Sequence, residues 1–272
     1  MLNVIIEIGD IMSDRLETLS NFYSTDCAED DRLLSKHGQV EFILTTHYID
    51  KYLKPGDKIL EVGAATGRYS IYYAQQGYDV SSIELVQSNL DILKSKITPD
   101  MKIRAEQGDA IDLSRFEDNT FDVTLILGPL YHLYEEQDIN KAIDEAIRVT
   151  KPQGKIYIAF LTNDSVVISW VLKDHHFDTK GKSFSDSYEM TKDVNEVFST
   201  FSVDEFDSIM STKPVNKLHM VATDGMSHHM KEVVDSLDDY EFNEWIRYNL
   251  LSCERHDLQG YSNHMVYICE KK

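Results

Sequence analysis

The hydrophobic positions of the chain follow two alternating periods. From about residue 13 to 53 they recur at helical spacing, and the sequence Lys-Pro-Gly at 54–56 ends this helical region. Five short strands are then predicted, at 58–63, 78–85, 101–107, 121–127 and 155–161, of which 121–127 is a β-rich apolar run typical of a buried strand. Helical stretches lie between most of them, at 68–76, 86–97 and 137–150. We therefore predict an α/β fold with a parallel sheet and helices on both of its faces.

The alternation changes after residue 161. Two more strands are predicted at 215–222 and 264–269, among helical pieces at 166–172, 203–210 and 230–251. The segments 162–201 and 225–260 are expected to be helical insertions that cap the carboxyl edge of the sheet, where open α/β sheets bind ligands. We divide the chain into an N-terminal helical lid region, 1–56, and a main domain, 57–272.

Charge narrows the range of partners. The 272 residues include 47 Asp and Glu against 27 Lys and Arg, a net charge of −20, and the parts before and after residue 160 are both acidic. Nucleic acid requires clustered Lys and Arg, and anionic lipid attracts basic segments, so we expect no nucleic acid and no membrane as a partner. A hydrophobic content of 42% suits a buried core and excludes a disordered chain.

The cysteines and the first residues bear on location. Cys27, Cys253 and Cys269 form no CxxC pair, as expected for a reduced, cytoplasmic protein. The first eleven residues are apolar but include Glu7 and Asp10, and they are too short to cross a bilayer and lack the basic flank of a signal peptide. The residue pattern leaves open whether the native start is the first methionine or the one at position 12, and whether the protein is a monomer or a homodimer.

The most informative segment is a turn of small residues between the first strand and the helix after it. Residues 59–67 read ILEVGAATG, and backbone N–H groups at such a turn face a ligand. Gly67 is followed by Arg68 rather than by the Lys of a triphosphate-binding loop, and Ala65 and Arg68 replace two glycines of a dinucleotide fingerprint. Glu61 would repel a pyrophosphate and attract an amino-acid ammonium.

Two further acids end the next two strands. Glu84 lies 21 residues after Gly63, where a carboxylate can accept hydrogen bonds from ribose hydroxyls. Asp109 directly follows Gly108 and is placed to accept a hydrogen bond from the exocyclic amine of adenine. Ammonium, ribose and adenine together describe S-adenosylmethionine, which contains no phosphate.

At this point the chain resembles a class I S-adenosylmethionine-dependent methyltransferase. The matching motifs are EVGAATG at 61–67, the strand-end Glu84, GDA at 108–110, and FDV at 121–123 leading to GPLYHL at 128–133. They cover about residues 57–161, and GPLYHL resembles a bacterial subgroup of these enzymes that is mostly credited with small-molecule substrates. The resemblance implies a Rossmann-like, doubly wound sheet of seven strands that is mostly parallel, with an antiparallel last strand.

The resemblance also indicates which residues contact the cofactor. In the loop these are Glu61, Gly63, Ala64, Ala65, Thr66 and Gly67, and further along they are Tyr69, Glu84, Leu85, Asp109, Ala110, Leu127 and Gly128. Tyr131 and His132 are the candidates for facing the methyl acceptor, because a histidine there could accept a proton, although His132 could instead have a purely structural bond to the backbone. Members of this family often close the N-terminal segment over the cofactor. Tyr23 and Arg32 are therefore lid candidates, with a solvated helix as the alternative.

Other histidines and aromatic residues are less informative. The adjacent histidines at 175–176 and 228–229 are not expected to bind a metal, because neighbours in sequence rarely point the same way and no acid stands at ligand spacing. The aromatic residues of the first insertion either line an acceptor pocket or anchor the cap to the core, and they are Trp170, Phe177, Phe184 and Tyr188.

We therefore predict transfer of a methyl group from S-adenosylmethionine to a small-molecule acceptor, by direct displacement at the sulfonium carbon. The leaving thioether is neutral, so the rate depends chiefly on alignment and dehydration of the reacting pair, and no nucleophile–His–Asp set is required. Two alternatives stay open: a methyltransferase acting on RNA or protein, and a non-catalytic S-adenosylmethionine-binding protein. Glu61, Ala65 and Arg68 disfavour a dehydrogenase.

Overall fold

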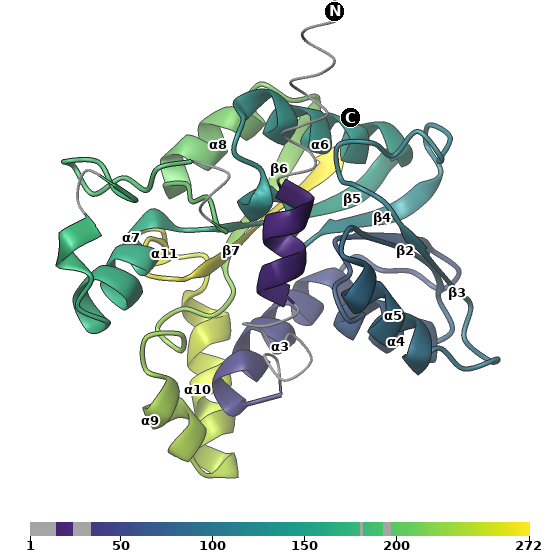
Figure 1. The fold of residues 1–272 in the computed structure, drawn as a ribbon. Helices are drawn as coiled ribbons and strands as arrows, with labels where there is room; N and C mark the ends of the chain where they lie inside the picture. The colour runs from purple at the N-terminus through teal and green to yellow at the C-terminus, as the bar shows by residue number, and fades with distance from the viewer. Residues whose placement is uncertain (1–14, 24–33, 180–181, 193–196) are drawn as a thin grey trace, which may run out of the picture.

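A seven-stranded sheet forms the centre of the computed structural model, which describes residues 15–23, 34–179, 182–192 and 197–272 (Figure 1). The strands are β1 (Lys58–Val62), β2 (Asp79–Glu84), β3 (Ile103–Gln107), β4 (Phe121–Ile126), β5 (Thr150–Leu161), β6 (Val215–Ala222) and β7 (His264–Lys271). Each lies where the hydrophobic pattern predicts a strand. The α/β fold class is therefore confirmed.

The strand order of the sheet reverses at one point. The order is β3-β2-β1-β4-β5-β7-β6, so the chain moves outward from β1 in one direction and then from β4 in the other. β1 pairs in parallel with both β2 and β4, and neighbouring strands from β3 to β5 are all parallel. In such sheets the ligand site lies at the carboxyl ends of the strands beside the point where the order reverses, here between β1 and β4.

The last strand runs against the others. β7 pairs antiparallel with β5 and with β6, as predicted for the last strand of this fold. Because β6 is antiparallel to β7, it runs in the same direction as β5. The carboxyl end of β6 and the beginning of β7 therefore meet at the same edge of the sheet as the carboxyl end of β1.

Helices cover both faces of the sheet (Figure 1). α4 (Arg68–Gln75) and α5 (Gln87–Lys96) connect β1 to β2 and β2 to β3, while α6 (Glu136–Val149) connects β4 to β5. Right-handed crossovers in opposite directions along the sheet put α6 on the face opposite to α4 and α5. The side chains that α6 buries recur at helical spacing, and they are Ile139, Ala142, Ile143, Ala146, Ile147 and Val149.

α3 (Lys36–Asp50) joins the N-terminal region to the core. Its N-cap is Ser35, whose hydroxyl accepts a hydrogen bond from the Gly38 amide. The hydroxyl of Tyr157, on β5, donates to the carbonyl oxygen of Tyr48 at 3.0 Å, so the helix is tied to the middle of the sheet. The assignment of 1–56 as a lid region stays a prediction.

The segments after β5 and β6 form the cap side of the molecule. After β5 come α7 (Asn163–Val166), the π-helical η3 (Val167–Lys173), the short η4 (Phe177–Thr179) and α8 (Val203–Ser211). After β6 come α9 (Lys231–Ser236), α10 (Asp239–Ser252), which packs on α3, and α11 (His256–Gln259). Among the helices that the structure describes, none has the length and apolar character needed to cross a membrane.

Candidate functional site

A cavity of about 990 Å³ follows the carboxyl edge of the sheet across β1, β2 and β4. This volume lies at the upper end of the roughly 300–1,000 Å³ typical of ligand pockets, which is room for a nucleoside-sized cofactor and an acceptor beside it. The predicted site residues within the described ranges all line it, namely Tyr23, Glu61, Gly63, Ala64, Ala65, Thr66, Gly67, Tyr69, Glu84, Leu85, Asp109, Ala110, Leu127, Gly128, Tyr131 and His132. Arg32 lies outside the described residues. The individual roles of these side chains stay predictions.

The turn after β1 depends on glycine at two positions. Gly63 has φ = 72° and Gly67 has φ = 88°, both in the left-handed region that side chains disfavour. A Cβ atom at Gly63 would collide with the ring of Pro129, and one at Gly67 would collide with Leu93. Ala65, between them, also has a positive φ of 46°, where glycine would be less strained. The turn therefore keeps its backbone close to whatever occupies the cavity.

Glu61 is a buried acid at the end of β1. It is 2% exposed, and its carboxylate accepts a hydrogen bond from the hydroxyl of Ser70 on α4. Burial raises the pKa of Glu61 to about 8, an effect that the Ser70 hydrogen bond opposes and the charge of Glu84 reinforces. A ligand ammonium would compensate the charged form, as expected for a carboxylate that holds an amino-acid group.

Glu84 organises the loop from the end of β2. Its Oε2 accepts from the amide of Ala65 at 2.8 Å, and its Oε1 accepts from the amide of Val86 at 2.9 Å. The carboxylate thus joins the glycine turn to the beginning of α5. Asn89 on α5 also lines the cavity, and among the described residues its buried Nδ2 has no hydrogen-bond partner. This buried amide donor, in a cavity that Glu61 and Glu84 also line, suits a ligand that offers hydroxyl groups and ring nitrogens as acceptors.

Asp109 has a partner that the sequence pattern did not indicate. Its Oδ2 forms an ion pair with the guanidinium of Arg15, from the helical segment 15–21, and its Oδ1 accepts from the amide of Ile111 at 3.3 Å. Both side chains are nearly buried. Arg15 therefore contacts the carboxylate predicted to meet adenine, and it brings the N-terminal segment across the cavity.

The two acceptor-side candidates are held in fixed orientations. The Tyr131 hydroxyl donates to the carbonyl oxygen of Leu127 at 2.8 Å. His132 lies with Nδ1 at 2.8 Å from the carbonyl oxygen of Val197 and Nε2 at 2.8 Å from the hydroxyl of Tyr23. Nδ1 must therefore carry the hydrogen, and Tyr23 donates to Nε2. Burial lowers the pKa of His132 to about 4, so the ring is neutral at physiological pH.

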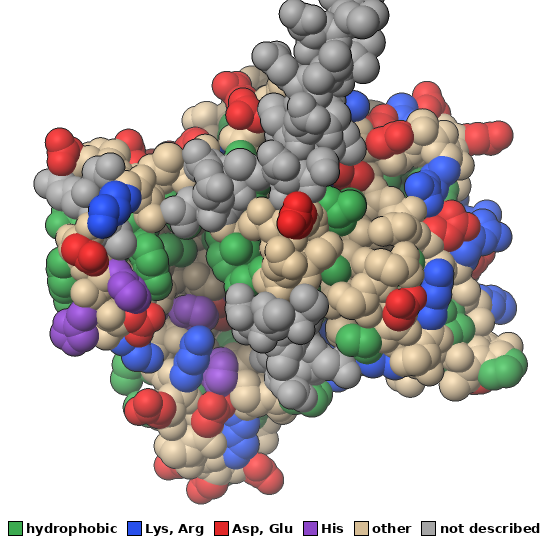
Figure 2. All heavy atoms as spheres, viewed as in Figure 1, with side chains coloured by type: hydrophobic (Ala, Val, Ile, Leu, Met, Phe, Trp, Pro, Cys, Tyr) green, Lys and Arg blue, Asp and Glu red, His purple; other side chains and the backbone are tan. Residues whose placement is uncertain are grey.

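The aromatic residues of the first insertion divide into two groups. Trp170 lines the cavity, and its ring lies 5.8 Å from that of the fully buried Phe184. Phe177 and Tyr188 are partly exposed and lie outside the cavity lining. Figure 2 shows hydrophobic and histidine side chains around the hollow beside this insertion, with charged groups of both signs spread over the rest of the face.

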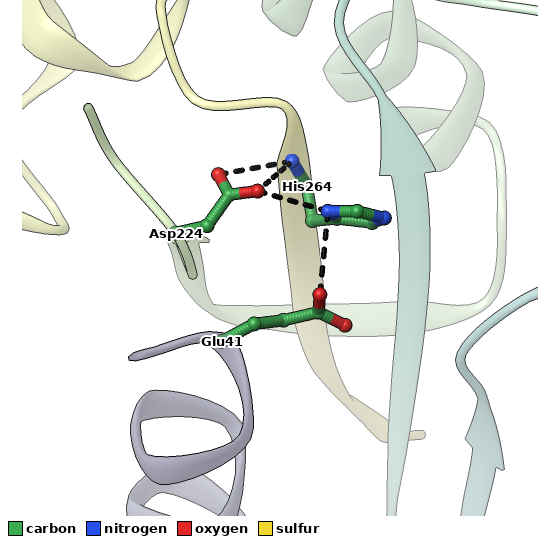
Figure 3. A group of neighbouring side chains, drawn as sticks. All are labelled: Glu41, Asp224 and His264. Carbon is green, nitrogen blue, oxygen red and sulfur yellow. Dashed lines mark hydrogen bonds and ion pairs between the residues drawn. The ribbon is translucent and has the colours of Figure 1, made fainter. Parts of the chain in front are cut away.

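Three polar residues from distant parts of the chain form a cluster at the same edge (Figure 3). Glu41 of α3, Asp224 after β6 and His264 at the beginning of β7 place their oxygen and nitrogen atoms within 4.8 Å of one another. His264 and the neighbouring Asn263 line the cavity. Sequence reasoning did not find this cluster: the tail at 254–264, which ends at His264, resembles the same bacterial subgroup, but Glu41 and Asp224 belong to no motif and the three residues are far apart in the chain. Alternation at 264–269 located the strand but not the role of its first residue.

Comparison with known proteins agrees with this geometry. Residues 60–158 match the model of the methyltransferase domain family. This part of the chain is therefore similar to a methyltransferase domain. A demethylmenaquinone methyltransferase of Paenarthrobacter aurescens is 38% identical over 107 residues, which are 39% of this chain and 40% of that protein. A ubiquinone biosynthesis O-methyltransferase of Rickettsia bellii is 24% identical over 150 residues, 51% of this chain and 60% of that protein.

The fold is also similar to that of solved methyltransferases. A SAM-dependent methyltransferase of Thermotoga maritima superposes with a TM-score of 0.57 at 16% identity, covering 94% of this chain and 99% of that one. The class I S-adenosylmethionine-dependent methyltransferase fold predicted from the motifs is therefore confirmed. The chain spans about two fifths of the length of the first curated relatives that it matches.

Proposed function

We propose that this protein transfers the methyl group of S-adenosylmethionine to a small-molecule acceptor. The observation that carries the proposal is the convergence of Glu61, Glu84 and Asp109, which end or follow three adjacent parallel strands and line one cavity beside the glycine turn. Three carboxylates at this edge suit an ammonium, a ribose and an adenine amine. They do not suit a phosphate, which each of them would repel.

The residues of the chain supply binding, orientation and exclusion of water. S-adenosylmethionine contributes the reactive methyl group, which a sulfonium makes electrophilic. In this proposal Glu61 pairs with the ammonium, Glu84 with the ribose and the turn amides with the methionine portion, which is supported by their common position on the cavity wall. Leu127 and Gly128, after β4, form the wall beside the acceptor side of the cavity. Enclosure of the pair raises the rate by alignment and dehydration, without an additional nucleophile.

The cap side of the cavity supports a small organic acceptor. Its wall includes Trp170, Phe198, Tyr131 and His132, and the last three rings pack against one another. The names of the relatives, which act on demethylmenaquinone or in ubiquinone biosynthesis, are consistent with an acceptor that contains an apolar ring. The net charge of −20 repels the phosphates of RNA, so it disfavours RNA as the acceptor.

Titration calorimetry with S-adenosylhomocysteine tests cofactor binding. Native protein is expected to bind it, and Glu84→Ala should weaken binding at least about tenfold, because the ribose loses two charge-assisted hydrogen bonds and the loop loses its link to α5. Glu117→Ala, at an exposed position outside the cavity, is the matched control and should bind like native protein. Absence of binding by native protein, or undiminished binding by Glu84→Ala, would show the proposal to be wrong.

The acceptor class is tested separately. Protein incubated with methyl-labelled S-adenosylmethionine and a bacterial extract, fractionated into small molecules, RNA and protein, should label only the small-molecule fraction. Mass spectrometry of the labelled compound then identifies the acceptor. Labelling of the RNA or the protein fraction instead would replace the small-molecule proposal with one of those classes.

A further inference from the structure

We propose that His264 is the base that removes a proton from the methyl acceptor, with Asp224 and Glu41 holding its ring in position. The inference rests on the proposed methyl transfer and adds a proton-accepting residue to that site. No motif in the recognised part of the chain contains any of the three residues, which lie outside residues 60–158.

The topology of the sheet explains why these residues meet. β6 runs with β1 and ends at Ala222, so Asp224 lies at the carboxyl edge of the sheet. β7 runs in the opposite direction, so its first residue, His264, lies at the same edge, and Ala222 pairs with Met265. Glu41 approaches from the first half of α3. Three elements thus deliver one histidine and two carboxylates to the wall of the cavity.

The hydrogen bonds fix the tautomer of the histidine. Nδ1 of His264 lies 2.9 Å from Oδ2 of Asp224 and 3.4 Å from Oε2 of Glu41. Both oxygens are acceptors and outnumber the one competing contact, the Asn263 side-chain nitrogen at 3.2 Å from Nδ1, so we assign the hydrogen to Nδ1. Asp224 is itself held by the hydroxyl of Ser262 at 2.6 Å and by the backbone amide of His264 at 3.2 Å. An imidazole whose Nδ1–H is held by carboxylates uses Nε2 as its proton acceptor.

The ring is oriented toward the reaction site. In Figure 3 the second ring nitrogen of His264 lies on the side opposite to Asp224 and Glu41. His264 lines the cavity, and its ring centroid lies 6.2 Å from that of Tyr131. The Tyr131 hydroxyl approaches Gly128, at the wall predicted to lie beside the sulfonium. An acceptor packed against Tyr131 therefore has the methyl donor on one side and His264 on the other.

The proton step conserves atoms and charge. An acceptor written X–H gives its proton to Nε2 of His264, and the electron pair left on X forms the new bond to the methyl carbon. The bond between that carbon and sulfur breaks, and its electron pair stays on sulfur, which becomes a neutral thioether. The positive charge thus passes from sulfonium to imidazolium, where Asp224 and Glu41 stabilise it.

The surrounding charges favour His264 over the other cavity histidines. The groups that face it are Asp224 and Glu41, the phenol of Tyr131, and His228 in the segment after β6. Burial raises the pKa of Asp224, but the hydrogen bond to His264 and the neighbouring histidines outweigh it, and the net shift keeps the carboxyl ionised. Burial lowers the pKa of His228 to about 3, so His228 contributes no opposing positive charge at neutral pH.

A divalent cation could in principle take the place of the Nδ1 proton between the two carboxylates. That arrangement would require His264 to lose the hydrogen for which Asp224 and Glu41 are already positioned as acceptors. A single proton on Nδ1 accounts for its distances to both Asp224 and Glu41, so the proton is the simpler assignment. All experiments below are therefore run with and without EDTA, and loss of activity in EDTA would contradict a proton-only role.

Histidine nitrogen NMR on the native protein with bound S-adenosylhomocysteine tests the assignment without knowledge of the acceptor. His264→Gln identifies the resonance of His264. We expect hydrogen on Nδ1, and uptake of a second proton at Nε2 between about pH 5 and 8. Asp224→Asn should lower the midpoint of that uptake by about one pH unit or more, because the imidazolium loses a neighbouring negative charge. Asp204→Asn, at the exposed partner of His256, is the matched control and should not move it.

Two results of this experiment would overturn the proposal. One is a hydrogen on Nε2 in the neutral ring, and the other is absence of titration at Nε2 between about pH 5 and 9. Both are measured on native protein, and the only variant that they need is His264→Gln, which assigns the resonance. If Asp224→Asn does not fold, Glu41→Gln provides the same comparison. Failure to bind S-adenosylhomocysteine would instead contradict the proposed function, and the state of His264 would still be measured.

Methylation of two probe acceptors tests catalysis directly. Phenol holds its proton at neutral pH, whereas benzenethiol ionises near neutrality and needs a base much less. His264→Gln should lower turnover of phenol about 100-fold or more and that of benzenethiol less than about threefold, with unchanged affinity for S-adenosylhomocysteine. An equal loss with both probes would indicate a structural role and contradict the proposal. If native protein methylates neither probe, the NMR result alone decides.

Discussion

At the scale of single residues, the site depends on an acid kept in an unfavourable environment. Glu61 is almost completely buried, and burial raises its pKa to about 8. At neutral pH the ligand-free protein therefore holds a proton on this carboxyl. Pairing with the ammonium of a bound ligand requires the charged form, so binding and proton release are coupled at this one residue.

This coupling predicts proton release on ligand binding. At about pH 7, binding of S-adenosylhomocysteine should release close to one proton, and affinity should rise toward pH 8, up to about tenfold per pH unit. Titration calorimetry in two buffers of different ionisation enthalpy measures the number released. Glu61→Gln, which has no proton to lose, should abolish the release. Binding heats that are the same in both buffers with native protein would contradict the prediction.

Glu61 also makes the free energy of unfolding depend on pH. Its folded pKa is raised from 4.5 to about 8, so between these values the folded chain binds one more proton than the unfolded chain. The stabilisation that this proton gives the folded state is fully present below about pH 4.5. It is lost as the pH rises to 8, by up to about 1.4 kcal/mol of unfolding free energy per pH unit. Urea unfolding of the ligand-free protein should show this decline. Glu61→Gln should flatten it.

At the scale of elements, the segment 15–23 spans the cavity between two fixed points. Arg15 pairs with Asp109 beyond the end of β3, and Tyr23 donates to His132 beyond β4. Both residues line the cavity. The lid role of Tyr23 stays a prediction, and it implies that this segment controls exchange of the cofactor.

Weakening both contacts is expected to accelerate exchange. The double variant Arg15→Gln, Tyr23→Phe should raise the dissociation rate of S-adenosylhomocysteine about tenfold, because it removes one charge-assisted and one neutral hydrogen bond. Stopped-flow fluorescence, with Trp170 in the cavity wall as reporter, measures the rate. Glu17→Gln, exposed on the same segment, is the control. A dissociation rate equal to that of native protein would show that the segment does not limit release.

The elements also show what sequence could and could not predict. β1 and β4 were predictable as largely apolar runs, and β2 and β3 by their place in the alternation of strands and helices; the acids at 61, 84 and 109 were predictable because each ends or closely follows one of these strands. Contacts such as Arg15 with Asp109, 94 residues apart, were not. His264 and Asp224 are 40 residues apart and meet only because β7 runs antiparallel. The spacing of hydrophobic residues along the sequence does not show which distant residues will meet.

At the scale of the whole molecule, the dominant property is a net charge of −20 on 272 residues. Ion pairs at the surface, such as Lys151 with Asp122 and Lys213 with Asp144, neutralise part of it, but acids remain in large excess. Mutual repulsion of these acids opposes the compact state and is screened by salt.

Added salt is therefore expected to stabilise the protein. Raising NaCl from about 0.01 to 0.15 M shortens the screening length from about 30 to 8 Å and should raise Tm by a few degrees. Differential scanning fluorimetry measures the change. Choline chloride at the same ionic strength should act equally, because the effect is screening rather than binding of sodium. A Tm that falls with salt would show that attractive ion pairs outweigh the repulsion.

The direction of β7 has a practical consequence for handling the protein. The strand begins at the cavity with His264 and ends at Lys271, whose ammonium contacts the Asn119 side chain and the Thr150 carbonyl at the opposite edge of the sheet. A tag, surface anchor or fused partner attached after Lys272 will point away from the cavity mouth. The same attachment placed before Arg15 will instead be joined to the segment 15–23, which lies across the cavity. Immobilised assays and fusion proteins should therefore be built on the C-terminal side.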